Sequence, residues 1–386
     1  MAPVDLLALP DPALTEGAEN TAQRRVSEVE LRFPPPHPKM RACVVIPARN
    51  EERILAEVIA ALAEQRDLGG ALLDAQGYEV LLLLNNCTDG TARVARGLQQ
   101  RYSRLTLHIG EIFFPPEEAH VGRARQALFD IAFSRFQMLH RSIGLILTTD
   151  ADSRPAADWL AQNEAEIAAG ADAVGGRITL NRAEKAALPA GVQRLFALDI
   201  GYRRALEELR CLYAPEAHDP FPRHHQHFGG SLALTATAYA RSGGMPLRRT
   251  NEDVALYRAV VESGGRFRHS YRVRVHTSAR MFGRAQGGLA DAIRWWSGKA
   301  HDASPVLVES AHAAHARLAR LGLWCAENPG RCPAKKLTDT PEPPTVDERA
   351  EIHATLCALR IINAELRPLS VAMRLDRARR KLSQRQ

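Results

Sequence analysis

The chain of 386 residues lacks any C-x-x-C pair, because its six cysteines are scattered. That absence argues against zinc ribbons and redox-active dithiols, and an even cysteine count alone does not indicate a disulfide framework in a chain this long. The sequence also lacks an apolar run long enough to span a bilayer, and residues 1–17 lack the basic start of a secretory signal. We therefore expect a cytoplasmic protein, and we leave open a peripheral contact at the inner face of a membrane.

A strong excess of one charge is also absent. The 51 lysines and arginines against 44 aspartates and glutamates give a net charge of +7. This surplus is spread thinly along the chain, with one concentration in the C-terminal "AMRLDRARRKLSQRQ". So thin a surplus does not indicate nucleic acid as a partner, and it fits anionic small molecules or an anionic membrane surface equally well. With 45% hydrophobic and 25% charged residues, the composition is that of a soluble globular protein.

Short apolar runs alternate with helical patterns in the first half of the chain. Runs that are rich in Val, Ile and Leu at every position are typical of a mostly parallel sheet with helices on both faces. In such sheets ligands bind beyond the carboxyl ends of the strands, so the residues just after each run are candidates for a site. The predicted strands are residues 41–48, 78–86, 104–110 and 144–152, and the predicted helices are residues 51–65, 91–102, 123–140 and 158–169.

The alternation weakens after residue 181, and this change suggests how the chain is organised. The second half contains a helical segment, a polar loop, a helix ended by glycines, and "RFRHSYRVRVHTSAR", which alternates like a strand at an exposed sheet edge. We expect an N-terminal arm or linker over 1–40, an α/β domain over 41–300 with halves at 41–180 and 181–300, and a C-terminal helical extension over 301–386 with a linker near 327–346.

Polar residues follow the first two predicted strands. In "VVIPARNEE", Asn50 could simply cap the next helix, which is the plainer interpretation of this turn. In "LLLLNNCTDGT", Asp89 is expected to cap a helix, whereas Asn85 lies just past a strand. The Asn85 amide can accept and donate hydrogen bonds together, as the edge of a flat nucleobase requires, and an ordinary turn is the alternative.

Charged residues follow at the third predicted helix and the fourth predicted strand. Arg123 and Arg125 lie near a helix start, where a cation opposes the helix dipole, so either a nearby anion or solvation would explain them. "TTDADSRP" places Asp150 and Asp152 one residue apart at a strand end. Two such carboxylates either form a turn or face one divalent cation, and their position at the ligand edge of the sheet favours Mn²⁺ or Mg²⁺.

The second half adds two candidate features. Glu252 and Asp253 follow Asn251 and the glycine loop "FGGS", and this acid pair either begins a helix capped by Asn251 or supplies a general base. His276 lies on a predicted strand with Arg274 on the same face. This histidine either completes a metal site or is an ordinary surface residue.

Taken together, these segments resemble the inverting family 2 glycosyltransferases of the GT-A fold. The resemblance covers about residues 41–296, and its pieces occur in the family's order: "VVIPARNEE", "NNCTDGT", "GRARQAL", "TTDADSRP", "FGGSLAL" and "NEDVAL". It implies an α/β GT-A fold, Rossmann-like with a mostly parallel central sheet and helices on both faces. It also implies a glycosyltransferase of class EC 2.4, with a nucleotide-diphosphate sugar bound by the first half of the domain and an acceptor hydroxyl by the second.

The resemblance assigns roles to particular residues. It implies that Asp253 is the catalytic base that deprotonates the acceptor hydroxyl. It implies that Asp152 and Asp150 hold Mn²⁺ or Mg²⁺ on the diphosphate, with Asp152 the more direct ligand and His276 a further one. The residues that it implies for donor binding are Pro47, Ala48, Glu51, Asn85, Arg125 and Asp150.

Two departures refine these expectations. The family commonly has an acid where Asn85 stands, which puts the identity of the base in doubt. Processive members carry Q-x-x-R-W, but Gln286 and Arg294 lie too far apart for that motif, so we expect transfer of single sugars. A sugar-nucleotide nucleotidyltransferase is one alternative, although "PARNEE" lacks the glycines of its phosphate loop, and a catalytically silent relative that binds nucleotide-sugar is another.

Overall fold

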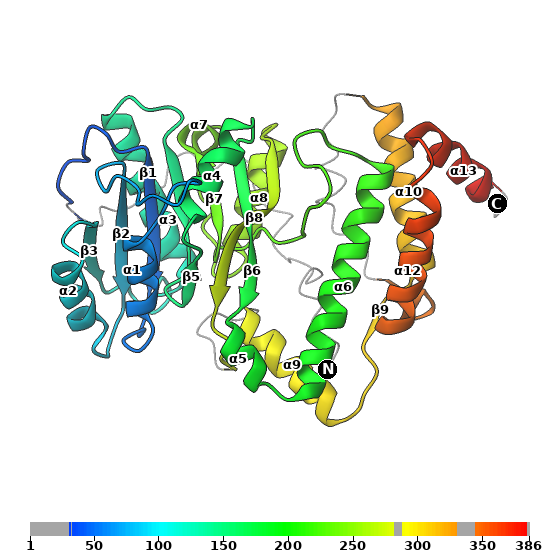
Figure 1. The fold of residues 1–386 in the computed structure, drawn as a ribbon, viewed down its shortest axis with the longest axis horizontal. Helices are drawn as coiled ribbons and strands as arrows, with labels where there is room; N and C mark the ends of the chain where they lie inside the picture. The colour runs from blue at the N-terminus through cyan, green and yellow to red at the C-terminus, as the bar shows by residue number, and fades with distance from the viewer. Residues whose placement is uncertain (1–30, 32, 282–287, 330–343, 384–386) are drawn as a thin grey trace. The chain divides into compact units, whose positions relative to one another are not determined.

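The computed structural model describes residue 31 and residues 33–281, 288–329 and 344–383 (Figure 1). They form two compact units. We call sheet unit the described residues up to Asn181 together with Gln226–Ser278, and helical unit Arg182–His225 together with the described residues from Ala279 onward. The division into 1–40, 41–300 and 301–386 stays a prediction, and most of the arm lies outside the described residues.

One eight-stranded sheet forms the sheet unit, in the order β3-β2-β1-β4-β7-β6-β8-β5. The strands on its first side are all parallel, the seventh runs antiparallel between the fourth and the sixth, and the fifth closes the edge antiparallel to the eighth. The bounds are β1 Ala42–Ala48, β2 Tyr78–Asn85, β3 Thr106–Ile112, β4 Leu145–Thr148, β5 Ser153–Pro155, β6 Ala173–Leu180, β7 Leu232–Thr235 and β8 Phe267–Thr277.

Helices cover both faces of this sheet, which explains why its central strands are mostly apolar. Every residue of β2 is buried, as is every residue of β1 except Pro47. Since side chains alternate between the faces, the strands supply two separate cores. The face we call the α4 face packs on α1 (Leu55–Ala63), α2 (Thr91–Arg101) and α4 (Trp159–Ala168), and the face we call the α8 face packs on α3 (Val121–Met138), α7 (Ala236–Arg241) and α8 (Glu252–Glu262).

The carboxyl ends of the strands that run in the same direction as β1 meet at one edge of the sheet. β2 and β4 are parallel to β1, and β6 regains that direction through the antiparallel β7, with β8 parallel to it. The ends of these strands therefore place Ala48, Asn85, Thr148, Leu180 and Thr277 at the same edge. This is the edge at which the sequence predicts the site.

The sequence pattern did not predict β6 or β7. The run "AVGGRITL" of β6 carries two glycines where a strand usually carries apolar side chains. A Cβ at Gly175 would lie 2.6 Å from the backbone oxygen of Gln226, and one at Gly176 would overlap the Ser231 hydroxyl. These two glycines allow neighbouring groups to approach the β6 backbone closely, so β6 lacks the continuous apolar pattern that predicts a buried strand. β8, predicted as an edge strand, has the short β5 beyond it.

The helical unit is organised around the long helix α6 (Ala190–Tyr213), beside which α10 and α12 run in Figure 1. Its core contains Leu209 of α6 with Leu318 and Leu359. No helix in the part of the chain that the structure describes is long and apolar enough to cross a membrane. The other elements are α5 Arg182–Ala187, α9 Leu289–His301, β9 Leu307–Glu309, α10 Ala311–Glu327, η1 Val346–Glu348, β10 Arg349–Glu351, α12 Ile352–Leu366 and α13 Val371–Ser383.

Candidate active site

A buried arginine joins the loop after β4 to the start of α8. Arg125 of α3 is only 3% exposed, and its Nη2 donates to Asp150 Oδ1 over 2.6 Å. Its Nη1 donates to Glu252 Oε1, on a carboxylate that is equally buried. The anion that the sequence predicts near Arg125 is therefore a pair of protein carboxylates. The neighbouring Arg123 pairs with Glu118 at 3.1 Å.

Burial controls the electrostatics of this cluster. It raises the pKa of Glu252 to about 7, while the Arg125 guanidinium opposes the rise and the Asp253 carboxylate adds to it. Burial alone would lower the pKa of Arg125, but Glu252 and Asp150 together keep it raised, so the guanidinium stays charged. Three carboxylates thus share one buried cation at the carboxyl edge of the sheet.

A glycine pair fits tightly between these groups. A Cβ at Gly229 would overlap the guanidinium of Arg125, and one at Gly230 would lie 3.2 Å from Asp150 Oδ2. The backbone N–H of Gly229 donates to Asp253 Oδ2 over 2.6 Å. The glycine loop "FGGS" therefore connects Asp150, which follows β4, with Asp253 in the first turn of α8.

Asp253 is half-buried, which leaves part of its carboxylate open to solvent. Its Oδ1 accepts from the backbone N–H of Val254 over 2.8 Å, so both oxygens are oriented by backbone donors. Asn251 has a left-handed backbone with φ of 57° and makes no side-chain capping bond, so the expectation that it caps α8 through its side chain is wrong. The helix start instead carries the acid pair, as its dipole favours.

Asp152 lies in the segment that joins β4 to the edge strand β5. Its backbone oxygen accepts from Ser278 N over 3.2 Å, which fixes it beside the end of β8. The hydroxyl of the next residue, Ser153, is buried and has no hydrogen-bond partner among the described residues. The carboxylates of Asp150 and Asp152 and the Ser153 hydroxyl are hard oxygen donors of the kind that Mn²⁺ and Mg²⁺ prefer, so the chemistry of these residues fits such an ion.

Four predicted donor-binding residues meet where β1 and β2 end. Pro47 and Ala48 pair with Leu83 and Leu84 of β2, so Asn85 follows directly beside them. Asn85 is 4% exposed, and its Oδ1 has no hydrogen-bond partner among the described residues. The backbone N–H of Glu51 donates to Thr91 Oγ1 over 2.8 Å.

Asn50 has a different role from the one first expected, whereas Asp89 accepts a hydrogen bond at the start of α2 from one residue before the Gly90 N-cap. Asn50 lies before the Ile54 N-cap of α1 rather than at it, and its Oδ1 accepts from Thr88 N over 2.8 Å. Asp89 Oδ1 accepts from the backbone N–H of Thr91 over 3.0 Å, at the start of α2. The two turns are therefore tied to each other across the ends of β1 and β2.

His276 lies on β8, opposite Arg154 of β5 and Thr179 of β6. Its Nδ1 lies 2.9 Å from Thr179 Oγ1. Partial burial lowers its pKa, and Arg154, Arg274 and Arg177 lower it further. The described residues contain no group of three His, Cys, Asp or Glu side chains with metal-holding geometry, so ligation by His276 stays a prediction.

The sequence reasoning missed an aromatic pair near Asp253. His227 stacks on Tyr257 with ring centroids 4.0 Å apart and planes at 11°. Tyr257 follows Asp253 by four residues, which places both on one face of α8. The four-residue spacing of Asp253 and Tyr257 could have been read from the sequence. In the structure it places the His227–Tyr257 ring stack beside the predicted base.

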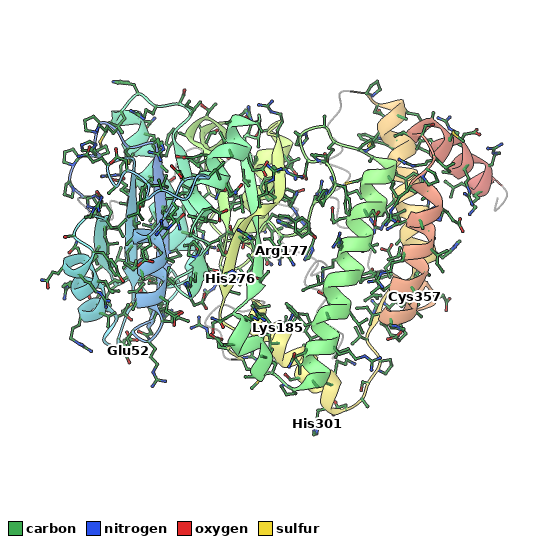
Figure 2. All side chains as sticks on the ribbon, viewed as in Figure 1. Glu52, Arg177, Lys185, His276, His301 and Cys357 are labelled. Carbon is green, nitrogen blue, oxygen red and sulfur yellow. The ribbon has the colours of Figure 1, made fainter. Side chains whose placement is uncertain are left out.

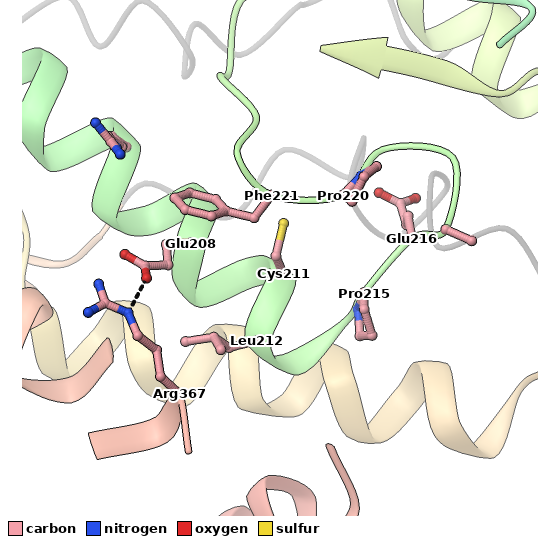
Figure 3. A pocket seen from close by; sticks show the side chains of 10 residues that line it. Glu208, Cys211, Leu212, Pro215, Glu216, Pro220, Phe221 and Arg367 are labelled. Carbon is pink, nitrogen blue, oxygen red and sulfur yellow. Dashed lines mark hydrogen bonds and ion pairs between the residues drawn. The ribbon is translucent and has the colours of Figure 1, made fainter. Parts of the chain in front are cut away.

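A separate cavity of about 750 Å³ lies in the helical unit (Figure 3). It is lined by Cys211, Leu212 and Phe221 together with the ion pair Glu208–Arg367, whose nitrogen and oxygen are 2.5 Å apart. Burial raises the pKa of the Cys211 thiol to about 11, so this sulfur stays protonated near neutral pH and is a poor nucleophile. None of the predicted site residues lines this cavity.

Residues 43–210 match the model of glycosyl transferase family 2. No match was found among curated proteins. Among solved structures, S. aureus TarS in complex with UDP is similar at 14% identity with a TM-score of 0.43, over 62% of this chain and 61% of that one, which is less than two thirds of its length. The mannosyltransferase PcManGT from Pyrobaculum calidifontis, in complex with GDP-Man and Mn²⁺, is similar at 19% identity with a TM-score of 0.42, over 86% of this chain and 89% of that one.

These structural likenesses are distant, and neither substrate nor mechanism follows from them. The family match runs from β1 into α6 and includes Asn85, Arg125 and Asp150. Residues 43–210 therefore form a family 2-like glycosyltransferase segment within an α/β structure of the GT-A type.

Proposed function

We propose that the chain is a metal-dependent, inverting glycosyltransferase that moves one sugar from a nucleotide-diphosphate sugar to an acceptor hydroxyl. The observation that carries this proposal is the Arg125 bridge, which holds Asp150 and the Glu252–Asp253 pair at one edge of the sheet. A leaving diphosphate and an attacking hydroxyl have to meet within one such site. Proposed transfer of single sugars rests on the spacing of Gln286 and Arg294, of which Gln286 lies outside the described residues.

In this mechanism Asp253 acts as the general base. Its carboxylate takes the proton of the acceptor hydroxyl as that oxygen bonds to the anomeric carbon, and the bond from this carbon to the diphosphate oxygen breaks on the opposite face. The backbone donors Gly229 and Val254 aim the carboxylate. Asp152, Asp150 and His276 are the residues proposed to hold Mn²⁺ or Mg²⁺, which when bound would neutralise charge on the departing diphosphate.

Pro47, Ala48, Glu51 and Asn85 are proposed to hold the base and ribose. The unsatisfied Asn85 Oδ1 supports this role, because a buried acceptor without a partner is costly unless a ligand donates to it. The imide N–H of a uracil or thymine base is a donor of the required kind. Arg125 is proposed to act near the diphosphate through Asp150, since its guanidinium is buried against protein carboxylates.

The decisive test of the proposed function is the Asp152→Ala variant. We expect it to abolish the metal-stimulated part of nucleoside diphosphate binding in calorimetric titrations with and without Mn²⁺. The matched control is Asp302→Ala, which removes an exposed carboxylate at the end of α9 and should bind as the wild type does. Metal-stimulated affinity that survives in Asp152→Ala would show that the metal is held elsewhere.

Asn85→Leu tests the base-binding role separately from the metal. We expect its affinity for the preferred nucleoside diphosphate to fall by about tenfold to a hundredfold, the usual effect of losing a buried hydrogen bond of about 1–3 kcal/mol. Its affinity for inorganic diphosphate with Mg²⁺ should not change, because that ligand has no base. Equal losses for both ligands would mean that Asn85 supports the site as a whole and does not read the base.

A further inference from the structure

Three arginines come together on one face of the sheet beside His276. In the sheet register Arg154 of β5 pairs with His276 of β8, and Arg177 of β6 pairs with Arg274 of β8. Residues paired across neighbouring strands point to the same face, as do residues two apart on one strand. All four side chains therefore share a face, and Figure 2 labels Arg177 and His276 on their adjacent strands.

The charge of these arginines is poorly compensated. Neither Arg154 nor Arg177 forms a salt bridge within the described part of the chain, and Arg177 instead lies over the Tyr271 ring, 5.0 Å from its centroid. Arg274 reaches Asp158 at 3.4 Å through a half-exposed contact, which is worth little in water. At least two guanidinium groups are thus available to an external anion.

This arginine cluster lies on the same face of the sheet as the proposed base. Gly175 of β6 and Phe267 of β8 face the core formed with α8, and Arg177 and Thr179 continue the Gly175 row by steps of two. After the irregularity between Gly176 and Arg177, the register brings Arg274 and His276 back to that row. The cluster therefore lies at the carboxyl edge on the α8 face, where Asp253 begins its helix.

We propose that Arg154, Arg177 and Arg274 form a subsite for an oxyanion, a phosphate or carboxylate, carried by the acceptor. Guanidinium groups bind such anions bidentately through paired N–H donors. An acceptor whose only polar group is a neutral hydroxyl would not need three guanidinium groups, whereas an acceptor with an oxyanion would use them. The inference rests on the proposed function, since it assigns the acceptor its chemical class. The diphosphate of the donor is also an oxyanion. The experiment must therefore distinguish an anion on the acceptor from the diphosphate of the donor.

The experiment is a calorimetric titration of inorganic phosphate into the full chain, first alone and then saturated with Mg²⁺ and a nucleoside diphosphate. We expect phosphate to bind in both states, because the three arginines are not among the residues proposed to hold the donor. In the double variant Arg154→Gln/Arg177→Gln, phosphate affinity should fall by about tenfold or more, as expected for loss of charge-assisted hydrogen bonds. The control Arg101→Gln removes an exposed arginine of α2 and should bind phosphate as the wild type does.

Two results would overturn the inference. Phosphate affinity that is unchanged in the double variant would show that the cluster takes no oxyanion. Displacement of phosphate by the nucleoside diphosphate would assign the arginines to the donor. Nucleoside diphosphate binding in the double variant reports separately on the proposed function, so the subsite can fail while the donor site stands. Thermal unfolding checks that the variant folds, which we expect because Arg154 is exposed, Arg177 is half-buried, and neither forms a salt bridge within the described part of the chain.

Discussion

Asp253→Asn is expected to lower sugar transfer by about 10²–10⁴-fold, the usual contribution of a general base. The amide oxygen of asparagine can still accept from Gly229 N, which keeps the contact with the glycine loop, although the Val254 N–H then loses its side-chain acceptor. An amide cannot take a proton from the acceptor. Affinity for the nucleoside diphosphate should therefore not change. The measurement is release of nucleoside diphosphate from a nucleotide-sugar, with the acceptor that supports turnover by the wild type.

The comparison variant for this prediction is Asp302→Asn, which makes the same change at an exposed position of the helical unit and should keep full turnover. If Asp253→Asn turns over at the wild-type rate, the base lies elsewhere, and the neighbouring Glu252 becomes the next candidate. If donor affinity falls together with turnover, Asp253 organises the donor site and is not the base.

Arg125→Met is expected to destabilise the chain by about 3–5 kcal/mol at pH 8, because it leaves the buried Glu252 carboxylate without its cation. Methionine keeps much of the volume of the side chain, so the loss reports mainly on charge. We also expect loss of nucleotide-sugar turnover, since Asp150 loses the guanidinium that holds it. The free energy of unfolding is measured by urea titration followed by circular dichroism.

The effect should depend on pH with a definite sign. Burial raises the folded-state pKa of Glu252 from 4.5 to about 7, so the stabilisation linked to this carboxyl is full below pH 4.5 and is lost as the pH rises through 7. Removing the guanidinium removes the influence that lowers this pKa, so the folded-state pKa should rise further. The destabilisation by Arg125→Met should therefore be smaller at pH 5 than at pH 8.

The double variant Arg125→Met/Glu252→Gln separates a charge effect from a packing effect. With no unpaired carboxylate left at position 252, it should regain part of the stability that Arg125→Met loses, and its loss should depend less on pH. Equal losses in the single and the double variant, at both pH values, would show that Arg125 acts through packing alone.

Much of the first half of the fold could be predicted because its signal is local. The runs that became β1, β2 and β4 are buried on both faces, so their sequence is mostly apolar without alternation. The chain direction of such strands then places Asn85, Asp150 and Asp152 at one edge without knowledge of any contact.

The rest of the site depends on contacts between residues far apart in the sequence. Arg125 and Glu252 are separated by 127 positions, and nothing near either one signals the other. Arg154 and Arg177 each look like ordinary surface arginines until the register of β5, β6 and β8 brings them to one face. β6 itself was not predicted, because two of its positions are glycines at which neighbouring groups approach the backbone closely.

The short edge strand β5 also bears on how the molecule behaves at high concentration. A sheet edge with free backbone groups invites pairing with another chain, and proteins limit this with very short edge strands, charge and proline. β5 has three residues, including the exposed Arg154, and ends at Pro155, which has no N–H to donate. The segment that follows Asp152 therefore also protects this edge of the sheet against edge-to-edge aggregation.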